Sequence, residues 1–458
     1  NIFALDDIKF ITGLEVEPQV ATEAALKKQL DRAYDSAGTM ADVMKNMEED
    51  LAVVEEEEAE VQASGLDQMN EAPIVKLVNS LIADAVRKGA SDIHIEPYEK
   101  TMRVRFRIDG VLHEMMAPPH KFKAAITSRL KIMADLDIAE RRVPQDGRIK
   151  IKVLNRTIDL RVNSLPTIFG EKIVMRILDK ANLNIDLTKL GFEPQAFKSL
   201  MTAISSPYGM VLVTGPTGSG KTTTLYSALS RVNTPEVNVM TAEDPVEYNL
   251  DGINQVLVNE SVGLTFASAL KAFLRQDPNI IMVGEIRDLE TAAIAVKAAL
   301  TGHLVLSTLH TNDASSAVGR LLDMGIEPFL VSSTVEGVMA QRLVRTICKD
   351  CKVEYEPDQS DVPPDFPGAG GRLTLFKGAG CRSCRQSGYR GRLGLFELLV
   401  ASDPLRELIV ARENAMRIRQ QALKEGMVTL RQDGWRKVLA GMTTLEEVCR
   451  VTAGDIVL

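Results

Sequence analysis

Short apolar runs alternate with amphipathic stretches along the C-terminal part of the chain. The apolar runs have the length of strands buried on both faces, and the amphipathic stretches repeat their apolar positions at helical spacing. The expected strands are 210–214, one ending at Thr241, 279–283 and 304–307, and the expected helices begin at Lys221 and cover 266–275 and 289–300. This alternation predicts an α/β domain over 187–458 with a parallel sheet.

A different pattern occupies residues 73–186. It opens with an amphipathic helix that stops at Gly89, and strands with alternating polar and apolar positions follow, such as 102–108. Asp109-Gly110 predicts a hairpin turn after that strand. The remaining elements are a helix over 122–133 and strands over 147–153, 157–162 and 172–178. The pattern predicts a separate α+β domain.

The N-terminal region has a weaker pattern. Residues 23–34 have helical spacing, and 1–44 is interpreted as the remnant of an N-terminal domain, since the sequence starts with Asn1 rather than Met. Residues 45–72 are rich in acids, with consecutive glutamates at 55–58. Like charges repel and little apolar surface is available, so the segment predicts a flexible linker, with a solvated helix as the alternative.

Length and composition narrow the class of protein. A chain of 458 residues is long enough for about three domains. The net charge of −8 and the aromatic content of 5% disfavour a nucleic-acid partner. No apolar run approaches the roughly 18 residues of a membrane span, and no secretory signal is visible. Five cysteines without a signal favour a reducing compartment, so the expected location is cytoplasmic.

One glycine-rich segment after the 210–214 strand carries a complete phosphate-binding pattern. Gly215, Gly220, Lys221 and Thr222 fill G-x-x-x-x-G-K-[ST] between an expected strand and an expected helix. Its backbone N–H groups suit phosphate oxygens, Lys221 reaches the β- and γ-phosphates, and the Thr222 hydroxyl is a ligand for Mg²⁺. The residues expected to bind nucleotide are Gly215, Pro216, Thr217, Gly218, Ser219, Gly220, Lys221, Thr222 and Thr223.

Carboxylates follow two of the expected strands. Glu285 comes just after the 279–283 strand, where a phosphate-loop ATPase keeps a group that orients or deprotonates water. Glycine rather than aspartate precedes it, so Mg²⁺ is expected to rely on Thr222, water and the acids of 243–247. Glu243 and Glu247 are therefore candidate catalytic residues, with a capped turn as the alternative.

His310 ends another strand among small polar residues rather than on an apolar face. It is expected to sense the γ-phosphate, with a core histidine as the alternative.

Four of the five cysteines form two C-x-x-C pairs separated by a Pro/Gly-rich loop: Cys348, Cys351, Cys381 and Cys384. Such a set predicts one tetrahedral zinc site that holds the loop, within an element over about 346–390. Free thiols are the alternative, and redox chemistry is less favoured. The remaining Cys449 is expected in a helix core.

Arginines are frequent in the strands of the α+β domain: Arg103, Arg105, Arg107, Arg148, Arg156, Arg161 and Arg176. For any single arginine a surface ion pair is the default. A guanidinium also suits phosphate, so some of them are candidates to meet the nucleotide.

Taken together, these motifs resemble the secretion ATPases that drive type IV pilus extension and type II secretion. The resemblance covers residues 70–458 and rests on the segments 90–97 (ASDIHIEP), the phosphate loop, 243–247 (EDPVE), 284–288 (GEIRD) and 306–312 (LSTLHTN). It implies a RecA-like ATPase domain preceded by a PAS-like domain, with ATP between them and six subunits in a ring.

The resemblance also implies roles for residues and partners. Lys221 would hold phosphates, Thr222 the metal and Glu285 the water, while His310 would report the γ-phosphate. The arginines expected to close on the nucleotide are Arg148, Arg161 and Arg176. The ring would lie at the inner face of the cytoplasmic membrane, peripheral to it, and would drive an inner-membrane platform protein that adds pilin subunits.

Other functions remain as alternatives. A type II secretion ATPase is the nearest, because its residue patterns differ little from those of the pilus extension ATPases. A ring helicase or DNA translocase shares the RecA-like core but should show a basic channel with stacking aromatics. A retraction motor of the same superfamily would normally lack the N-terminal extension and the four cysteines.

Overall fold

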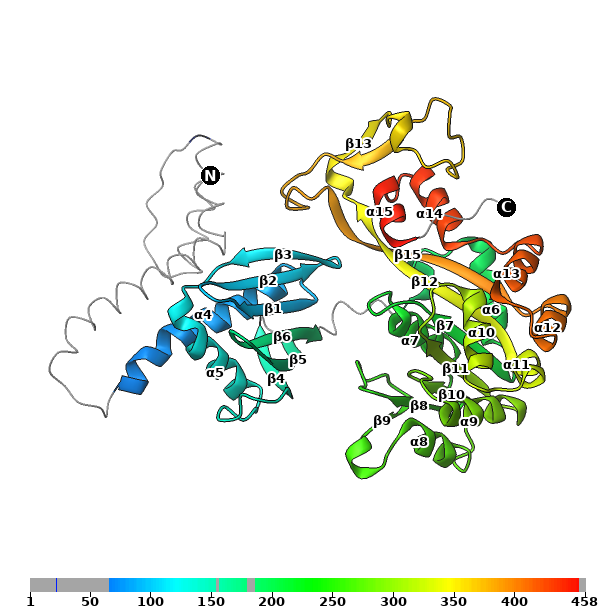
Figure 1. Ribbon diagram of the computed structural model, residues 1–458, viewed down its shortest axis with the longest axis horizontal. Coiled ribbons are helices and arrows are strands. Elements are labelled where there is room, and N and C mark those ends of the chain that lie inside the picture. The colour runs from blue at the N-terminus through cyan, green and yellow to red at the C-terminus, as the bar shows by residue number, and fades with distance from the viewer. Residues whose placement is uncertain (1–21, 23–65, 154–155, 179–185, 453–458) are drawn as a thin grey trace, which may run out of the picture. The chain divides into compact units, whose positions relative to one another are not determined.

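The computed structural model describes residues 22, 66–153, 156–178 and 186–452. The chain divides into two compact units at Leu178 and Asp179 (Figure 1). The helix expected over 23–34 and most of the expected linker lie outside the described residues. Among the described helices, none combines the length and the apolarity needed to cross a bilayer.

The first unit is a six-stranded antiparallel sheet in the order β3-β2-β1-β6-β5-β4. Its strands are β1 (Asp92–Pro97), β2 (Met102–Ile108), β3 (Val111–Met116), β4 (Gln145–Val153), β5 (Arg156–Thr167) and β6 (Gly170–Leu178). Helices α4 (Leu66–Arg87) and α5 (Lys123–Met133) supply apolar side chains to the core under the sheet. This is the expected α+β arrangement.

The hairpin turn and the start of the first helix can both be compared with the sequence. Asp109 and Gly110 have positive φ, 48° and 85°, as a two-residue hairpin turn between β2 and β3 requires. Helix α4 begins at Leu66, so residues 66–72 of the expected linker are helical, in line with the alternative of a helix there. The apolar face that made the helix visible in the sequence begins only at Ile74, which packs in the core.

The second unit is built on a seven-stranded sheet in the order β15-β12-β7-β11-β10-β8-β9. Its strands are β7 (Gly209–Thr214), β8 (Val239–Glu243), β9 (Asn254–Leu257), β10 (Ile280–Val283), β11 (Leu304–Leu309), β12 (Val335–Ile347) and β15 (Tyr389–Val400). The strands from β12 to β9 are parallel, as expected, but β15 pairs with β12 in the antiparallel direction. The sheet is therefore mixed.

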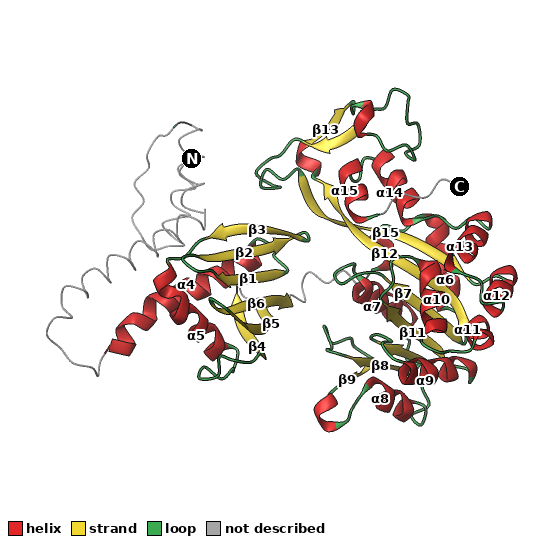
Figure 2. Cartoon of the chain, in the orientation of Figure 1, coloured by secondary structure: helices red, strands yellow, loops and turns green. Residues whose placement is uncertain are grey.

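Helices flank the strands of this sheet (Figure 2). They are α6 (Pro194–Ile204), α7 (Lys221–Val232), α8 (Phe266–Phe273), α9 (Leu289–Leu300), α10 (Ala314–Asp323), α11 (Pro328–Thr334), α12 (Asp403–Val410), α13 (Ala415–Lys424), α14 (Leu430–Leu439) and α15 (Leu445–Val451). Alternate residues of β7 enter two separate cores, Met210 on one side and Val211 on the other. The sheet is thus buried on both faces, which explains its continuous apolar runs.

A smaller two-stranded sheet, β13 (Lys352–Tyr355) and β14 (Leu375–Gly378), lies between β12 and β15 in the chain. The Pro/Gly-rich loop joining its strands packs against α14 and α15 through a core that includes Phe366 and Trp435. Asp365 adds an ion pair to Arg431 and accepts a hydrogen bond from the Trp435 indole. The loop is therefore anchored by packing and by the contacts of Asp365.

Candidate functional site

The phosphate loop, residues 215–222, leaves the carboxyl end of β7 and enters α7. Gly215, Gly218 and Gly220 all have positive φ, at 146°, 79° and 91°, which a residue with a Cβ adopts only at a cost. Gly220 is the N-cap of α7, and no described side chain caps that helix. The Ser219 hydroxyl is buried without a hydrogen-bond partner among the described residues. Uncapped N–H groups and an unpartnered hydroxyl fit an anionic ligand.

Lys221 lies within this loop. Its ammonium group donates to the carbonyl oxygens of Gly215 (2.8 Å) and Pro216 (3.1 Å). Burial lowers the pKa of Lys221, Glu285 opposes that shift, and Arg342 adds to it. The neighbouring Thr222 is exposed on the first turn of α7, as a metal-binding hydroxyl must be.

Glu285 and His310, predicted from separate motifs, lie together at this edge of the sheet. The His310 Nε2 atom is 3.2 Å from Glu285 Oε2, and Arg287 donates to Glu285 Oε1 at 2.5 Å. Burial alone would raise the pKa of Glu285, but Arg287 and then His310 hold it below its ordinary value. The carboxylate is therefore ionised at neutral pH, which is the form that accepts a proton from water.

Glu243 lies deeper than the sequence suggested. It is 3% exposed, and its oxygens accept hydrogen bonds from the Tyr226 hydroxyl, Thr241 (2.6 Å) and Gln255 (3.0 Å). Burial and the contact with Glu243 raise the pKa of Tyr226, so the phenol stays protonated and donates. The Glu247 backbone N–H donates to the same phenol at 3.3 Å. Both carboxylate oxygens of Glu243 are thus engaged in shaping the loop after β8.

The sequence analysis missed two residues of β12 that lie beside the phosphate loop. Gln341 is buried and accepts a hydrogen bond from the Thr224 hydroxyl of α7 at 2.8 Å. Arg342 donates to the carbonyl oxygen of Asn312 at 2.9 Å. They belong to no motif of fixed spacing, and only the pairing of β12 with β7 reveals them.

The predicted arginines of the first unit form one row across its sheet. Arg148 faces Arg161, and Arg161 faces Arg176, as direct partners on neighbouring antiparallel strands. Arg176 is paired with Asp92 at 3.0 Å, whereas Arg148 and Arg161 have no ion pair within the described part of this unit. Facing like charges disfavour the sheet slightly unless an anion joins them. The default of a surface ion pair holds for Arg103 and Arg105, which share Glu96, and for Arg107 with Asp92.

The four cysteines converge on one point. Their sulfur atoms all lie within 4.8 Å of one another, with Cys348–Cys381 at 3.8 Å, Cys351–Cys384 at 3.7 Å and Cys381–Cys384 at 3.6 Å. Four sulfurs at about 2.3 Å from a tetrahedral zinc ion are about 3.8 Å apart, so the donor set fits zinc. The expectation for Cys449 is wrong, because its side chain is exposed on α15.

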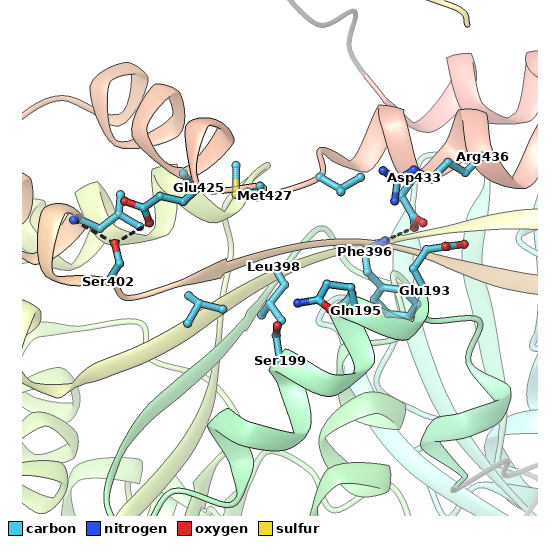
Figure 3. A pocket seen from close by; sticks show the side chains of 16 residues that line it. Glu193, Gln195, Ser199, Phe396, Leu398, Ser402, Glu425, Met427, Asp433 and Arg436 are labelled. Atoms are coloured by element: carbon cyan, nitrogen blue, oxygen red, sulfur yellow. Dashed lines mark hydrogen bonds between the residues drawn. The ribbon is translucent and has the colours of Figure 1, made fainter.

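A separate cavity of about 290 Å³ lies between α6, β15 and the C-terminal helices (Figure 3). Its walls include Phe396, Leu398 and Met427, with Glu193 and Asp433 toward one end. None of the phosphate-loop residues lines this cavity. The residues predicted from the sequence to bind nucleotide, catalyse or hold metal are therefore absent from the lining of this cavity.

The chain is similar to proteins of one known family. Residues 67–450 match the family described as "Type II/IV secretion system protein". The "Type IV pilus assembly ATPase PilB" of Myxococcus xanthus is 54% identical over 99% of this chain and 81% of its own. The "Type II secretion system ATPase E" of Vibrio cholerae is 52% identical over 84% of this chain and 77% of its own.

Solved structures of similar fold include two ATPases. The "Pilus Retraction Motor PilT" with bound ADP matches with a TM-score of 0.56 and 27% identity, over 82% of this chain and 97% of that one. The ATPase DotB of Legionella pneumophila matches with a TM-score of 0.61 at 20% identity, over 82% of this chain and 95% of that one, and shows the fold alone. The chain belongs to the family of type II/IV secretion system proteins, and it is an ATPase.

Proposed function

We propose that this ATPase is the motor of type IV pilus assembly, acting as a hexameric ring that drives an inner-membrane platform protein at the cytoplasmic face of the membrane. The observation that carries the proposal is the contact between Glu285 and His310 at the carboxyl ends of the parallel strands, close enough to the phosphate loop for Glu285 to act electrostatically on Lys221. Relatives named as pilus assembly ATPases align with nearly the whole chain, at 54%, 46% and 48% identity.

In the proposed reaction, the phosphate loop holds the β- and γ-phosphates of ATP. Lys221 neutralises their charge and the N-terminal N–H groups of α7 donate to their oxygens. Thr222 would help to hold Mg²⁺, which would supply further positive charge for the phosphates. Glu285 orients a water molecule and accepts its proton as the oxygen attacks the γ-phosphorus. The bond to the ADP oxygen breaks, and inorganic phosphate leaves.

His310 couples this chemistry to movement. Its ring nitrogen reaches the same carboxylate that handles water, so a change at the γ-phosphate alters the Glu285–His310 contact. The row of Arg148, Arg161 and Arg176 would supply the phosphate contacts from the first unit. Closure of one unit on the other would then pass the energy of hydrolysis to the platform protein.

The four-cysteine cluster is proposed to bind one zinc ion with a structural role. A closed set of four thiolates leaves no position for water or substrate, which distinguishes structural from catalytic zinc. Backbone N–H groups of Cys381 and Gly388 donate to the Cys384 sulfur, at 3.1 Å and 3.3 Å. Burial would raise the pKa of Cys384, but these donors lower it to about 6.

The proposal is tested by genetic complementation in the source organism. A strain lacking this protein should lose its pili, the parent chain should restore them, and Glu285→Gln should not. Glu290→Gln is a matched control, because Glu290 is an exposed acid on α9 paired with Lys271. Native mass spectrometry of the purified protein should find six chains.

Type II secretion is the second candidate, favoured by relatives of that name at 52% identity. The same strains distinguish the two functions. Restored secretion of folded exoproteins with no effect on pili would assign the motor to secretion instead.

A further inference from the structure

Strand β12 lies so close to the phosphate loop that a Cβ atom on Gly215 or Gly220 would clash with it. The strand pairs with β7 as far as Ala340 and Thr214, and the next residues, Gln341 and Arg342, continue alongside the loop. A Cβ atom on Gly215 would lie 2.5 Å from the Gln341 carbonyl oxygen and 3.1 Å from Arg342 Nη1. The absence of a side chain at Gly215 therefore allows β12 to pack directly against the phosphate loop.

The guanidinium of Arg342 is held beside the phosphate loop by hydrogen bonds to uncharged groups. Nη1 donates to the Gln341 carbonyl oxygen at 3.0 Å, and Nη2 donates to the Asn312 carbonyl oxygen at 2.9 Å. No carboxylate forms an ion pair with it anywhere in the described part of the chain. A half-buried guanidinium stays charged, so its positive potential acts on its surroundings. These include Glu397 and Asp313, whose charges oppose the effect of burial on the pKa of Arg342, as well as the phosphate loop.

Those surroundings include the nucleotide site. Lys221 donates to the carbonyl oxygen of Gly215, and Arg342 Nη1 lies so near the same glycine that a Cβ atom added there would be 3.1 Å from it. Two cations thus flank one residue of the phosphate loop. Asn312, which Arg342 also holds, is two residues beyond His310 at the end of β11.

We propose that Arg342 is a nucleotide-positioning residue, which adds a second positive charge behind the phosphate loop and anchors the segment after His310 to it. The inference rests on nucleotide binding at this loop. The charge comes from the same domain as the loop, so it acts before the two units close. It should favour ATP and ADP equally, because it faces the base of the loop that both nucleotides share.

The test is the binding of fluorescent ATP and ADP analogues to the purified full-length chain. Arg342→Gln should weaken both by about tenfold, equivalent to about 1.4 kcal/mol, and should make binding less sensitive to salt. Arg342→Lys keeps the charge and should recover most of the affinity. Since ground state and transition state lose the same interaction, KM should rise while kcat at saturating ATP stays near the parent value.

Arg345→Gln is the matched control on the same strand. Arg345 is paired with Glu447 at 2.7 Å and lies over the Tyr389 ring, so its loss should lower stability without changing nucleotide affinity. Parental affinity in Arg342→Gln with a lowered melting temperature would overturn the inference and leave Arg342 a packing role. A parent chain that binds neither nucleotide would overturn the proposed function itself.

Discussion

The phosphate loop and the four-cysteine cluster both lie where a strand of the seven-stranded sheet ends, after β7 and after β12, yet their polar groups have opposite arrangements. In the loop, α7 has no side-chain cap, and the Ser219 hydroxyl has no partner within the described residues. In the cluster, the sulfur atoms face one another, and Cys384 accepts two backbone hydrogen bonds. A segment that binds and releases a ligand needs hydrogen-bond donors without permanent partners, whereas in a structural segment the polar groups stay bound to one another.

The sharpest test of this contrast is Glu285→Gln, which should have the largest effect. The amide keeps the shape of the side chain but cannot accept a proton, so turnover should fall at least about 100-fold while ATP binding persists. Steady-state hydrolysis and analogue binding measure the two quantities, with Glu290→Gln as the control. Near-parental hydrolysis would move the base elsewhere, with Glu247 the next candidate because both oxygens of Glu243 are already hydrogen-bonded.

The cluster should respond in stability rather than in chemistry. Metal analysis should find about one zinc per chain, and Cys381→Ser should lower the melting temperature by about 5 °C or more. Surviving protein should hydrolyse ATP at near the parent rate, because Asp365 and Phe366 still anchor the loop. Cys449→Ser, at an exposed lone cysteine, should change neither quantity. Metal-free parent protein of full stability would contradict the zinc assignment.

The pH dependence of hydrolysis should show how the site tunes its base. The pKa of Glu285 is depressed, so the active carboxylate persists below the ordinary range of a glutamate and is lost only as the pH falls through that lowered value. Arg287→Gln removes the group that most strongly lowers the pKa of Glu285. Burial should then raise this pKa, so the acid limb of the kcat profile should move to higher pH. Lys297→Gln removes an exposed cation of α9 and should leave that limb in place. An unmoved limb in Arg287→Gln would show that another group titrates.

The smallest effect is expected from nucleic acid. With a net charge of −8 and few aromatics, added DNA or RNA should not stimulate ATP turnover at any salt concentration. Hydrolysis assays with single- and double-stranded DNA measure this directly. A tenfold stimulation that fades with salt would favour the helicase or translocase alternative.

Much of the fold was visible in the residue pattern. The predicted helix over 289–300 and the predicted strand over 102–108 have the bounds that the structure gives to α9 and β2. Strand β1 was missed, although Asp92, His94 and Glu96 alternate with apolar residues. The structure also buries these polar side chains, which the alternation does not predict. Burial of a charged face depends on neighbours such as Arg105, which only the sheet brings together.

The sequence by itself determined the motifs whose chemistry is local: the glycine loop, the carboxylate after β10, the histidine after β11 and the two cysteine pairs. Each needs only a fixed spacing along the chain, and parallel strands bring their carboxyl ends to one edge. Only the tertiary structure decided that Glu243 is buried beneath the site and that Arg342 stands behind the loop. Both depend on contacts between residues distant in sequence, Tyr226 with Glu243 and β12 with β7, and no local pattern encodes such distances.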